Sequence, residues 1–243
     1  MTTRDDVHRV ITDAILNHPR SLQTQIGPSE IGTECDRCLG HKLVGTPKRR
    51  DADWAPYVGV SVHARLEQIF LDAGMAGRWA AETRVWVGDI DGQEIHGSCD
   101  LYDSHTGTVI DFKTASKTQL KNARANGPSQ QYRIQAHLYG RGWQHNGADV
   151  QAVALCYLPR DGSLSESFWW EEPYDEQVAI DALARADALA KAIRVVGADT
   201  ILPTLTRSPD TCWDCQRGRY PTYPTDPPLP TGQAAPFADL IPA

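Results

Sequence analysis

The pattern of apolar residues along the chain predicts several helices. Apolar side chains recur at helical spacing in residues 5–16, 58–73 and 174–196, and the last of these segments is the most regular. A further helix is expected over about 129–145, after a polar linker. Each amphipathic segment is expected to pack one side against a core.

Strands are expected between these helices. Residues 82–90, 93–102 and 107–114 predict three consecutive strands, and the dipeptide Asp91-Gly92 is a strong signal for a hairpin turn between the first two. The apolar run at 150–160 predicts a central strand after the helix at 129–145. Helix, three antiparallel strands, helix and strand in this order predict an α/β (α+β) fold with a central mixed sheet flanked by helices.

The strand TVIDFKT at 108–114 carries opposite charges on one face. Side chains alternate along a strand, so Asp111 and Lys113 point to one side while Ile110 and Phe112 point to the other. A carboxylate and an ammonium group on a half-buried strand form either a structural ion pair or part of a functional site. The neighbouring segments decide between these two interpretations.

A second carboxylate is expected beside Asp111. The preceding strand contains Gly97 and Asp100, and a hairpin of this length would bring Asp100 next to Asp111 at the end of the sheet. Two carboxylates that close repel each other strongly unless a cation lies between them. A hard divalent ion such as Mg²⁺ fills that role with oxygen ligands.

Two helices carry further polar pairs at one-turn spacing. His63 and Glu67 share a face of the helix at 58–73, and a histidine added to two carboxylates would favour Mn²⁺ as well. Gln135 and Tyr139 share a face of the helix at 129–145. Taken alone, the first pair is equally well explained as an exposed ion pair and the second as an ordinary helix surface.

Together these segments resemble the RecB-like branch of the PD-(D/E)XK nucleases. The motifs of that family, in order, are G-x-x-x-H, G-x-x-D, (D/E)-x-K and Q-x-x-x-Y. The matching residues here are Gly59 with His63, Gly97 with Asp100, Asp111 with Lys113, and Gln135 with Tyr139. The resemblance covers about 30–220 and implies a restriction-endonuclease-like core.

The resemblance also implies roles for individual residues. His63, Asp100, Asp111 and the backbone carbonyl of Phe112 would hold Mg²⁺ or Mn²⁺. Lys113 would orient or activate the attacking water and stabilise the charge that builds on the phosphate.

Two other sets of residues have less specific roles. Glu67 would contact a second metal or a water, or serve only the structure, while Gln135 and Tyr139 would position the DNA strand. A basic stretch surrounds this last pair, since no acidic residue occurs from Phe112 to Ala148. Its candidate DNA-binding residues are Lys117, Lys121, Arg124 and Arg133.

Composition allows a nucleic-acid substrate but does not require one. The net charge of −7 argues against a protein that binds nucleic acid over its whole surface. A local basic patch can still neutralise phosphates, because salt confines such fields to about 10 Å. The alternative is a solvated basic face.

The six cysteines include two C-x-x-C pairs, Cys35 with Cys38 and Cys212 with Cys215. Two such pairs are typical of a site with four thiolate ligands, and the spacing alone favours Zn²⁺. The resemblance favours a 4Fe-4S cluster that joins the N- and C-terminal segments, as in CRISPR-associated RecB-type exonucleases. Those relatives usually have one early and three late cysteines, whereas this chain has two and two.

The sequence therefore predicts a metal-dependent DNA exonuclease acting on single strands or ends, with a structure-specific or flap endonuclease and a non-catalytic DNA-binding module as alternatives. The expected organisation is an N-terminal helical segment (1–57), a nuclease core (58–200), a second cysteine segment (201–220) and a Pro-rich disordered tail (221–243). No P-loop signature occurs, so any unwinding of duplex DNA would need a helicase or recombination partner.

The location expected of this chain is the cytoplasm, or the host cytoplasm if a phage encodes it. No apolar run approaches the ~18 residues that cross a bilayer, and the first residues do not form a secretory signal. No membrane partner is expected, and the oligomeric state is left open.

Overall fold

The computed structural model describes residues 2–19, 23–49, 51–73, 77–208, 212–224 and 226. Its centre is a five-stranded sheet in the order β1-β2-β3-β4-β5. The strands are β1 (Trp79–Ile90), β2 (Gln93–Asp103), β3 (Thr108–Ala115), β4 (Ala152–Pro159) and β5 (Phe168–Pro173). Only β3 and β4 pair in parallel, and the other neighbours are antiparallel. The sheet is therefore mixed, as the sequence predicts.

The four longest helices occupy the predicted positions, with ends shifted by a few residues. They are α1 (Thr3–Leu16), α5 (Trp54–Asp72), α7 (Gln130–His145) and α8 (Glu176–Val196). The shorter helices are α3 (Pro28–Ile31), α4 (Asp36–Leu43), α6 (Lys117–Asn126), α9 (Ala198–Ile201) and α10 (Trp213–Gln216), with 3-10 turns η1 (Leu164–Glu166) and η2 (Leu202–Thr204).

Helix α6 corrects one expectation, since a polar linker was predicted in its place. Ser116 and Gln119 form a capping box at its start, in which each side chain accepts a hydrogen bond from the other residue's backbone N–H. Leu120 and Ala123 are its buried residues. Two apolar residues within a polar segment are too few for periodicity to reveal the helix, although they bury one side of it.

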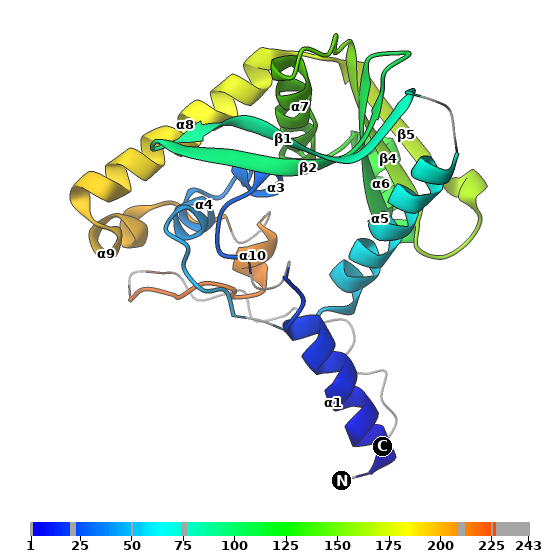
Figure 1. Ribbon diagram of the computed structural model, residues 1–243. Helices are drawn as coiled ribbons and strands as arrows, with labels where there is room; N and C mark the ends of the chain where they lie inside the picture. The colour runs from blue at the N-terminus through cyan, green and yellow to red at the C-terminus, as the bar shows by residue number, and fades with distance from the viewer. Residues whose placement is uncertain are drawn as a thin grey trace.

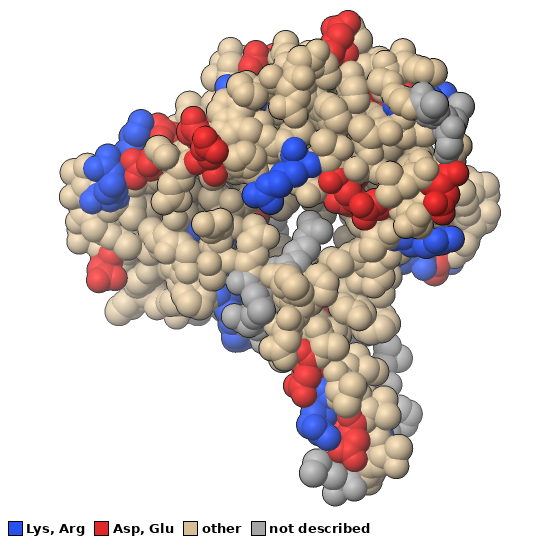
Figure 2. All heavy atoms as spheres, in the orientation of Figure 1, with Lys and Arg blue, Asp and Glu red and all other residues tan. Residues whose placement is uncertain are grey.

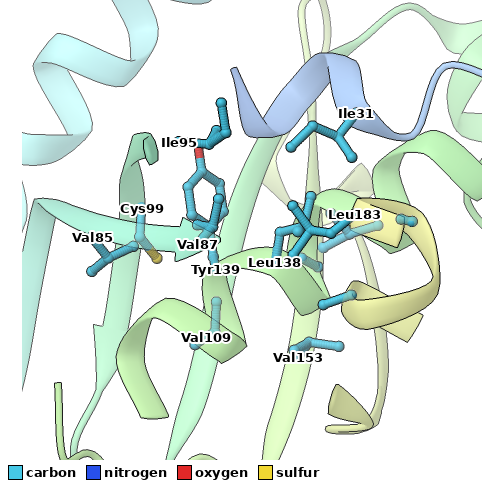
Figure 3. Packing of buried hydrophobic residues seen from close by; sticks show 14 of the residues in the cluster. Ile31, Val85, Val87, Ile95, Cys99, Val109, Leu138, Tyr139, Val153 and Leu183 are labelled. Atoms are coloured by element: carbon cyan, nitrogen blue, oxygen red, sulfur yellow. The ribbon is translucent and has the colours of Figure 1, made fainter. Parts of the chain in front are cut away.

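Helices cover both faces of the sheet, as Figure 1 shows. Helix α5 packs Leu66 and Phe70 against Ile110 and Phe112 of β3. On the opposite face α7 and α8 pack against the sheet, and their residues meet in the main core around Val109, Leu138, Val153 and Leu183 (Figure 3). Ile110 and Phe112 therefore face α5, which leaves Asp111 and Lys113 on the face covered by α7.

Residues 203–205, 220, 223 and 226 contact α4 beside this core. The guanidinium of Arg37 donates hydrogen bonds to the carbonyls of Pro203 and Leu205, and it forms an ion pair with Asp226. The ring of Tyr220 stacks on His41, with ring centroids 4.7 Å apart, and Tyr223 lies in the same stack.

The beginning of the predicted tail (221–243) therefore contacts α4 through Tyr223 and Asp226. The remainder of the tail, 227–243, lies outside the described residues.

Helix α1 projects away from the rest of the molecule (Figure 1). Its Val7, Val10 and Ile11 side chains are exposed. Within the described chain, no helix combines the length and the apolar character needed to span a bilayer.

Candidate active site

Asp111 and Lys113 on β3 form the centre of the candidate site. The Asp111 side chain is nearly inaccessible, since the residue is 1% exposed, and its Oδ2 lies 2.6 Å from the Nζ of Lys113. Lys113 also donates a hydrogen bond to Oε1 of Gln135 on α7, at 2.8 Å, and Gln135 donates through Nε2 to Oδ1 of Asp111, at 3.0 Å. These three side chains form a closed polar network between β3 and α7.

Asp100 on β2 joins this network from the neighbouring strand. Its Oδ2 accepts a hydrogen bond from the backbone N–H of Phe112, at 2.7 Å. The last paired residues of the two strands are Leu101 and Ile110, so Asp100 and Asp111 follow directly after the paired region. The carboxylate of Asp100 thereby accepts a hydrogen bond from the β3 backbone just beyond the paired region. This hydrogen bond fixes the position of the Asp100 side chain against β3.

His63 approaches from α5. Its Nδ1 lies 3.1 Å from Oδ1 of Asp100, so the two oxygens of Asp100 contact the histidine and the β3 backbone. Gly59, one turn earlier, lets α5 come close to the end of β3: a Cβ at Gly59 would lie 3.3 Å from Oγ1 of Thr114. A side chain at this position would force Thr114 or α5 to shift by a few tenths of an ångström.

The structure adds Glu82, which the sequence did not identify. Donor atoms of His63, Glu82 and Asp100 all lie within 4.8 Å of one another. Glu82 is in β1 between Ala81, opposite Leu101, and Thr83, opposite Cys99. It therefore lies across the hairpin from Asp100, and its backbone φ of 43° marks a distorted strand at this point.

A bulge explains why sequence counting fails to find Glu82. Starting from the Asp91-Gly92 turn, the register pairs Ile90 with Gln93, and an unbroken ladder would place Thr83 opposite Asp100. The register shifts by one residue between Trp86 and Gly88, which brings Glu82 into that place instead. No sequence signal other than the glycine itself indicates this bulge.

Glu67 does not join this group. It is half-buried on α5, one turn beyond His63, and is not among the donors that cluster with His63 and Asp100. The carboxylate of Asp111 also lies outside this group, since its oxygens contact Lys113 and Gln135.

Gln135 and Tyr139 are both buried, although they were expected to contact a DNA strand. Gln135 is 4% exposed and contacts Asp111 and Lys113, and Tyr139 lies in the main core under Gly97. In this structure Gln135 supports the side chains of Asp111 and Lys113, and Tyr139 packs in the core.

The basic residues expected to bind DNA are on α6 and α7, and three of them have local partners. Lys117 lies 3.4 Å from Asp161, Arg124 donates a hydrogen bond to the carbonyl of Glu166, and Arg133 lies 2.5 Å from Glu172. Lys121 is exposed. On the face seen in Figure 2, positive and negative side chains are interspersed and do not form one continuous positive patch.

Glycine at position 97 permits close packing above the site. A Cβ there would lie 2.6 Å from Cγ of Pro28 on α3 and 3.1 Å from Cε1 of Tyr139. We therefore expect Gly97→Ala to lower the free energy of unfolding by about 1–3 kcal/mol, measured by urea denaturation. Gly27→Ala is the control, because its Cβ would meet only the exposed side-chain amide of Gln23, at 3.3 Å. Equal, small effects of both changes would contradict this explanation.

The charges of the site alter its protonation. Burial alone would lower the pKa of His63, but the hydrogen bond to Asp100 and the charges of Asp100 and Asp111 raise it above 6.5. Burial raises the pKa of Asp111 to about 6, although the ammonium group of Lys113 opposes that rise. Both groups therefore hold protons at a higher pH than usual, and a cation that binds them must displace those protons.

This competition predicts a pH dependence of cation binding. Protons occupy His63 and Asp111 at low pH, so the affinity of metal-free protein for Mn²⁺ should fall as the pH decreases through about 6. Isothermal titration calorimetry at a series of pH values measures this affinity, and NMR titration of metal-free protein should place the pKa of His63 above 6.5. An affinity that is constant across this range would contradict the prediction.

The donor atoms suit a hard divalent cation. Carboxylate oxygens with one imidazole nitrogen are ligands that Mg²⁺ and Mn²⁺ accept. Oδ2 of Asp111 is buried and accepts no well-aligned hydrogen bond, even though the Nζ of Lys113 is near. An oxygen in this state has lone pairs available for a cation.

A second cluster of metal-binding side chains joins α4 and α10. Ligand atoms of Cys35, Cys38, Cys212 and Cys215 all lie within 4.8 Å of one another. The thiols come from the start of α4 and from α10, which are far apart in sequence. Four thiols at this separation repel one another once ionised, so the group fits a bound cation. Cys99 and Cys156 lie elsewhere, in the core clusters beside the sheet.

No protein-family model matches this chain, and no curated protein matches it. Several solved structures resemble it at low sequence identity. The structure of LHK-Exo in complex with dAMP gives a TM-score of 0.50 at 14% identity, over 73% of this chain and 91% of that one. LHK-Exo is an alkaline exonuclease from Laribacter hongkongensis.

Two other matches have lower TM-scores. A protein from Eubacterium rectale named as an exonuclease gives 0.48 at 15% identity, over 93% of this chain and 96% of that one. A phage-related exonuclease from Haemophilus somnus gives 0.43 at 14% identity, over 59% of this chain and 71% of that one. The mixed α/β fold predicted from the sequence is thus the fold observed, and the chain shares it with LHK-Exo.

Proposed function

We propose that this protein is a divalent-metal-dependent deoxyribonuclease that degrades DNA from its ends. The observation that carries the proposal is the buried carboxylate of Asp111, held between Lys113 and Gln135 beside the group of His63, Glu82 and Asp100. A carboxylate in such a place is costly to bury unless a cation or a proton compensates it. The fold shared with LHK-Exo agrees with this function.

In the proposed site, His63, Asp100, Asp111 and the backbone carbonyl of Phe112 would hold Mg²⁺ or Mn²⁺. The ion would lower the pKa of a bound water and polarise the phosphate. Glu82 would add a further carboxylate to this set. The sequence suggested Glu67 for such an additional carboxylate.

Lys113 would act on the reacting groups themselves. Its ammonium group is held by Asp111 and Gln135, and it lies over the ring of Tyr132, 4.3 Å from the centroid. Held in this way, it would orient the attacking water and stabilise the negative charge that develops on the phosphate.

Gln135 would position Lys113 and Asp111, a different role from the expected contact with DNA. Gln135→Leu keeps the size of the side chain and removes both hydrogen bonds, so we expect kcat to fall about 10- to 100-fold with KM for DNA little changed. Steady-state kinetics measure both quantities. The control is Gln144→Leu near the end of the same helix, where the side chain is exposed. A rise in KM at constant kcat would instead support a DNA-binding role.

The substrate would enter along the surface that carries α6 and α7. Lys117 and Lys121 are exposed there, and Arg124 and Arg133 would exchange their present partners for phosphates. Figure 2 also shows a hollow between the β1–β2 hairpin and α5, the elements that carry Glu82, Asp100 and His63. The segments 1–57 and 201–220 would frame the nuclease core at 58–200. The protein would act in the cytoplasm, and a helicase or recombination partner would open duplex DNA.

Digestion of labelled DNA tests this proposal. Single-stranded oligonucleotides labelled at the 5′ or 3′ end and a circular single strand of the same composition would be incubated with Mn²⁺ or Mg²⁺. An exonuclease degrades the linear strands stepwise and leaves the circle intact. Cutting of the circle would indicate an endonuclease, and no cutting of any substrate would reject the nuclease proposal.

A further inference from the structure

We propose that the four cysteines bind a single tetrahedral Zn²⁺ ion and that they do not bind the 4Fe-4S cluster implied by the family resemblance. The inference rests on the separation of the four sulfur atoms and on the space around them. It is independent of the proposed nuclease activity, because none of the four thiols belongs to the candidate active site.

The sulfur atoms are close enough to share one ion. Sγ of Cys215 lies 3.5 Å from Sγ of Cys35 and 3.3 Å from Sγ of Cys38, and ligand atoms of all four residues lie within 4.8 Å of one another. Four thiolates bound to one zinc at 2.3 Å in a tetrahedron are separated by about 3.8 Å. The two separations of 3.5 and 3.3 Å are slightly shorter than this value, and the remaining separations are at most 4.8 Å.

A 4Fe-4S cluster requires a wider arrangement. Each of its four thiolates binds a different iron, and the irons occupy alternate corners of a cube that also contains four sulfides. The cysteine sulfurs then lie roughly 6 Å apart, because two outward iron–sulfur bonds add to the distance between irons. To accept a cluster, the thiols of Cys35, Cys38 and Cys215 would each have to move outward.

The surroundings restrict such a movement. Cys35 is completely buried and Cys38 nearly so, and Tyr220 packs against both pairs of thiols in one small cluster. An outward movement of these sulfurs would therefore have to displace the packed ring of Tyr220.

The local backbone also matches a closed structural site. Cys35 is the N-cap of α4, and its sulfur accepts a hydrogen bond from the backbone N–H of Cys38. The second pair encloses the start of α10, so each C-x-x-C pair presents its two thiols from one tight turn.

Metal analysis of the full-length protein tests the proposal. The protein would be expressed with added iron and purified without oxygen, so that an iron–sulfur cluster could form and survive. We expect about one zinc per chain by mass spectrometry, no acid-labile sulfide, and no visible absorption. Four irons with matching sulfide, or a single iron in place of zinc, would overturn the proposal.

A second measurement guards against incorrect loading during expression. The metal would be removed without oxygen, and the protein would be offered Co²⁺ alone, or ferrous iron with sulfide. We expect Co²⁺ to bind one per chain with the absorption of a tetrahedral thiolate complex, and no cluster to assemble. Assembly of a stoichiometric cluster, or failure to bind Co²⁺, would overturn the proposal.

Matched variants assign the metal to these thiols. Cys212 is the most accessible of the four, so Cys212→Ser is the ligand change least damaging to the fold, and it should weaken Co²⁺ binding and alter the spectrum. Cys156→Ser, in the β4 strand, should leave both unchanged. Unaltered Co²⁺ binding in Cys212→Ser would reject the assignment, and the wild-type metal analysis decides the case if this variant does not fold.

Discussion

Asp111→Asn is expected to lower the rate of DNA hydrolysis by about 10³-fold or more while the protein stays folded. The change keeps the shape of the side chain and removes its negative charge. If Asp111 binds the catalytic cation, the loss removes both a metal ligand and the group that holds Lys113. Single-turnover digestion of an end-labelled oligonucleotide measures the rate.

The folded state should lose stability but persist. Asparagine leaves Lys113 without its ion-pair partner, and its side-chain NH₂ faces either the ammonium group of Lys113 or the amide of Gln135, so we expect the free energy of unfolding to fall by about 3 kcal/mol. Thermal unfolding of metal-free protein measures this loss, and the rates are compared at a temperature at which both proteins are folded. The matched control is Asp181→Asn, an exposed aspartate on α8, which should leave the rate unchanged. Wild-type activity in Asp111→Asn would contradict the assignment.

Loss of a cysteine ligand should have the largest effect on stability. The sulfur of Cys215 lies within 3.5 Å of the sulfurs of both Cys35 and Cys38. Cys215→Ser therefore removes the thiol of α10 that contacts both thiols of α4. Structural thiolate sites contribute much of the folding free energy of the segments they join. We expect the melting temperature to fall by about 10 °C or more.

Differential scanning calorimetry measures this loss, and limited proteolysis should show cleavage near the chain ends in the variant. Cys156→Ser is the control, because that thiol lies on β4, outside the four-cysteine group. A melting temperature equal to that of wild type would show that the four cysteines do not hold the chain ends together.

Much of the fold could be predicted because its long elements have regular patterns. Helices α1, α5, α7 and α8 are amphipathic or follow a recognisable turn or linker segment. The Asp91-Gly92 turn fixes the first hairpin. Alternation along TVIDFKT correctly placed Asp111 and Lys113 on one side of β3. Helices and strand faces of this kind follow from the local spacing of apolar residues, so they can be predicted without knowledge of tertiary contacts.

What the sequence did not reveal depends on tertiary contacts. Glu82 reaches Asp100 only because a bulge near Gly88 shifts the register by one residue. Helix α6 is stabilised by a capping box and two buried residues within a polar segment. The contacts of Tyr223 and Asp226 with α4 occur in a segment whose composition is typical of a disordered tail.

The same limit applies to the roles of single residues. Gln135 and Tyr139 have the spacing expected for a DNA contact, yet spacing gives no information on burial. Gln135 contacts Lys113 and Asp111, and Tyr139 is part of the core. The cysteine spacing identified a four-thiol group, whereas the size of the ion depends on distances that only the folded chain provides.

The most direct test of the central claim is the rate at which metal-free protein degrades an end-labelled single strand as Mn²⁺ or Mg²⁺ is added. We expect no hydrolysis in the presence of a chelator, rapid hydrolysis once either ion is restored, and almost none with either ion in Asp111→Asn. DNA that stays intact with both ions, or that is cut equally well in the chelator, would contradict the claim that these residues form a metal-dependent nuclease site.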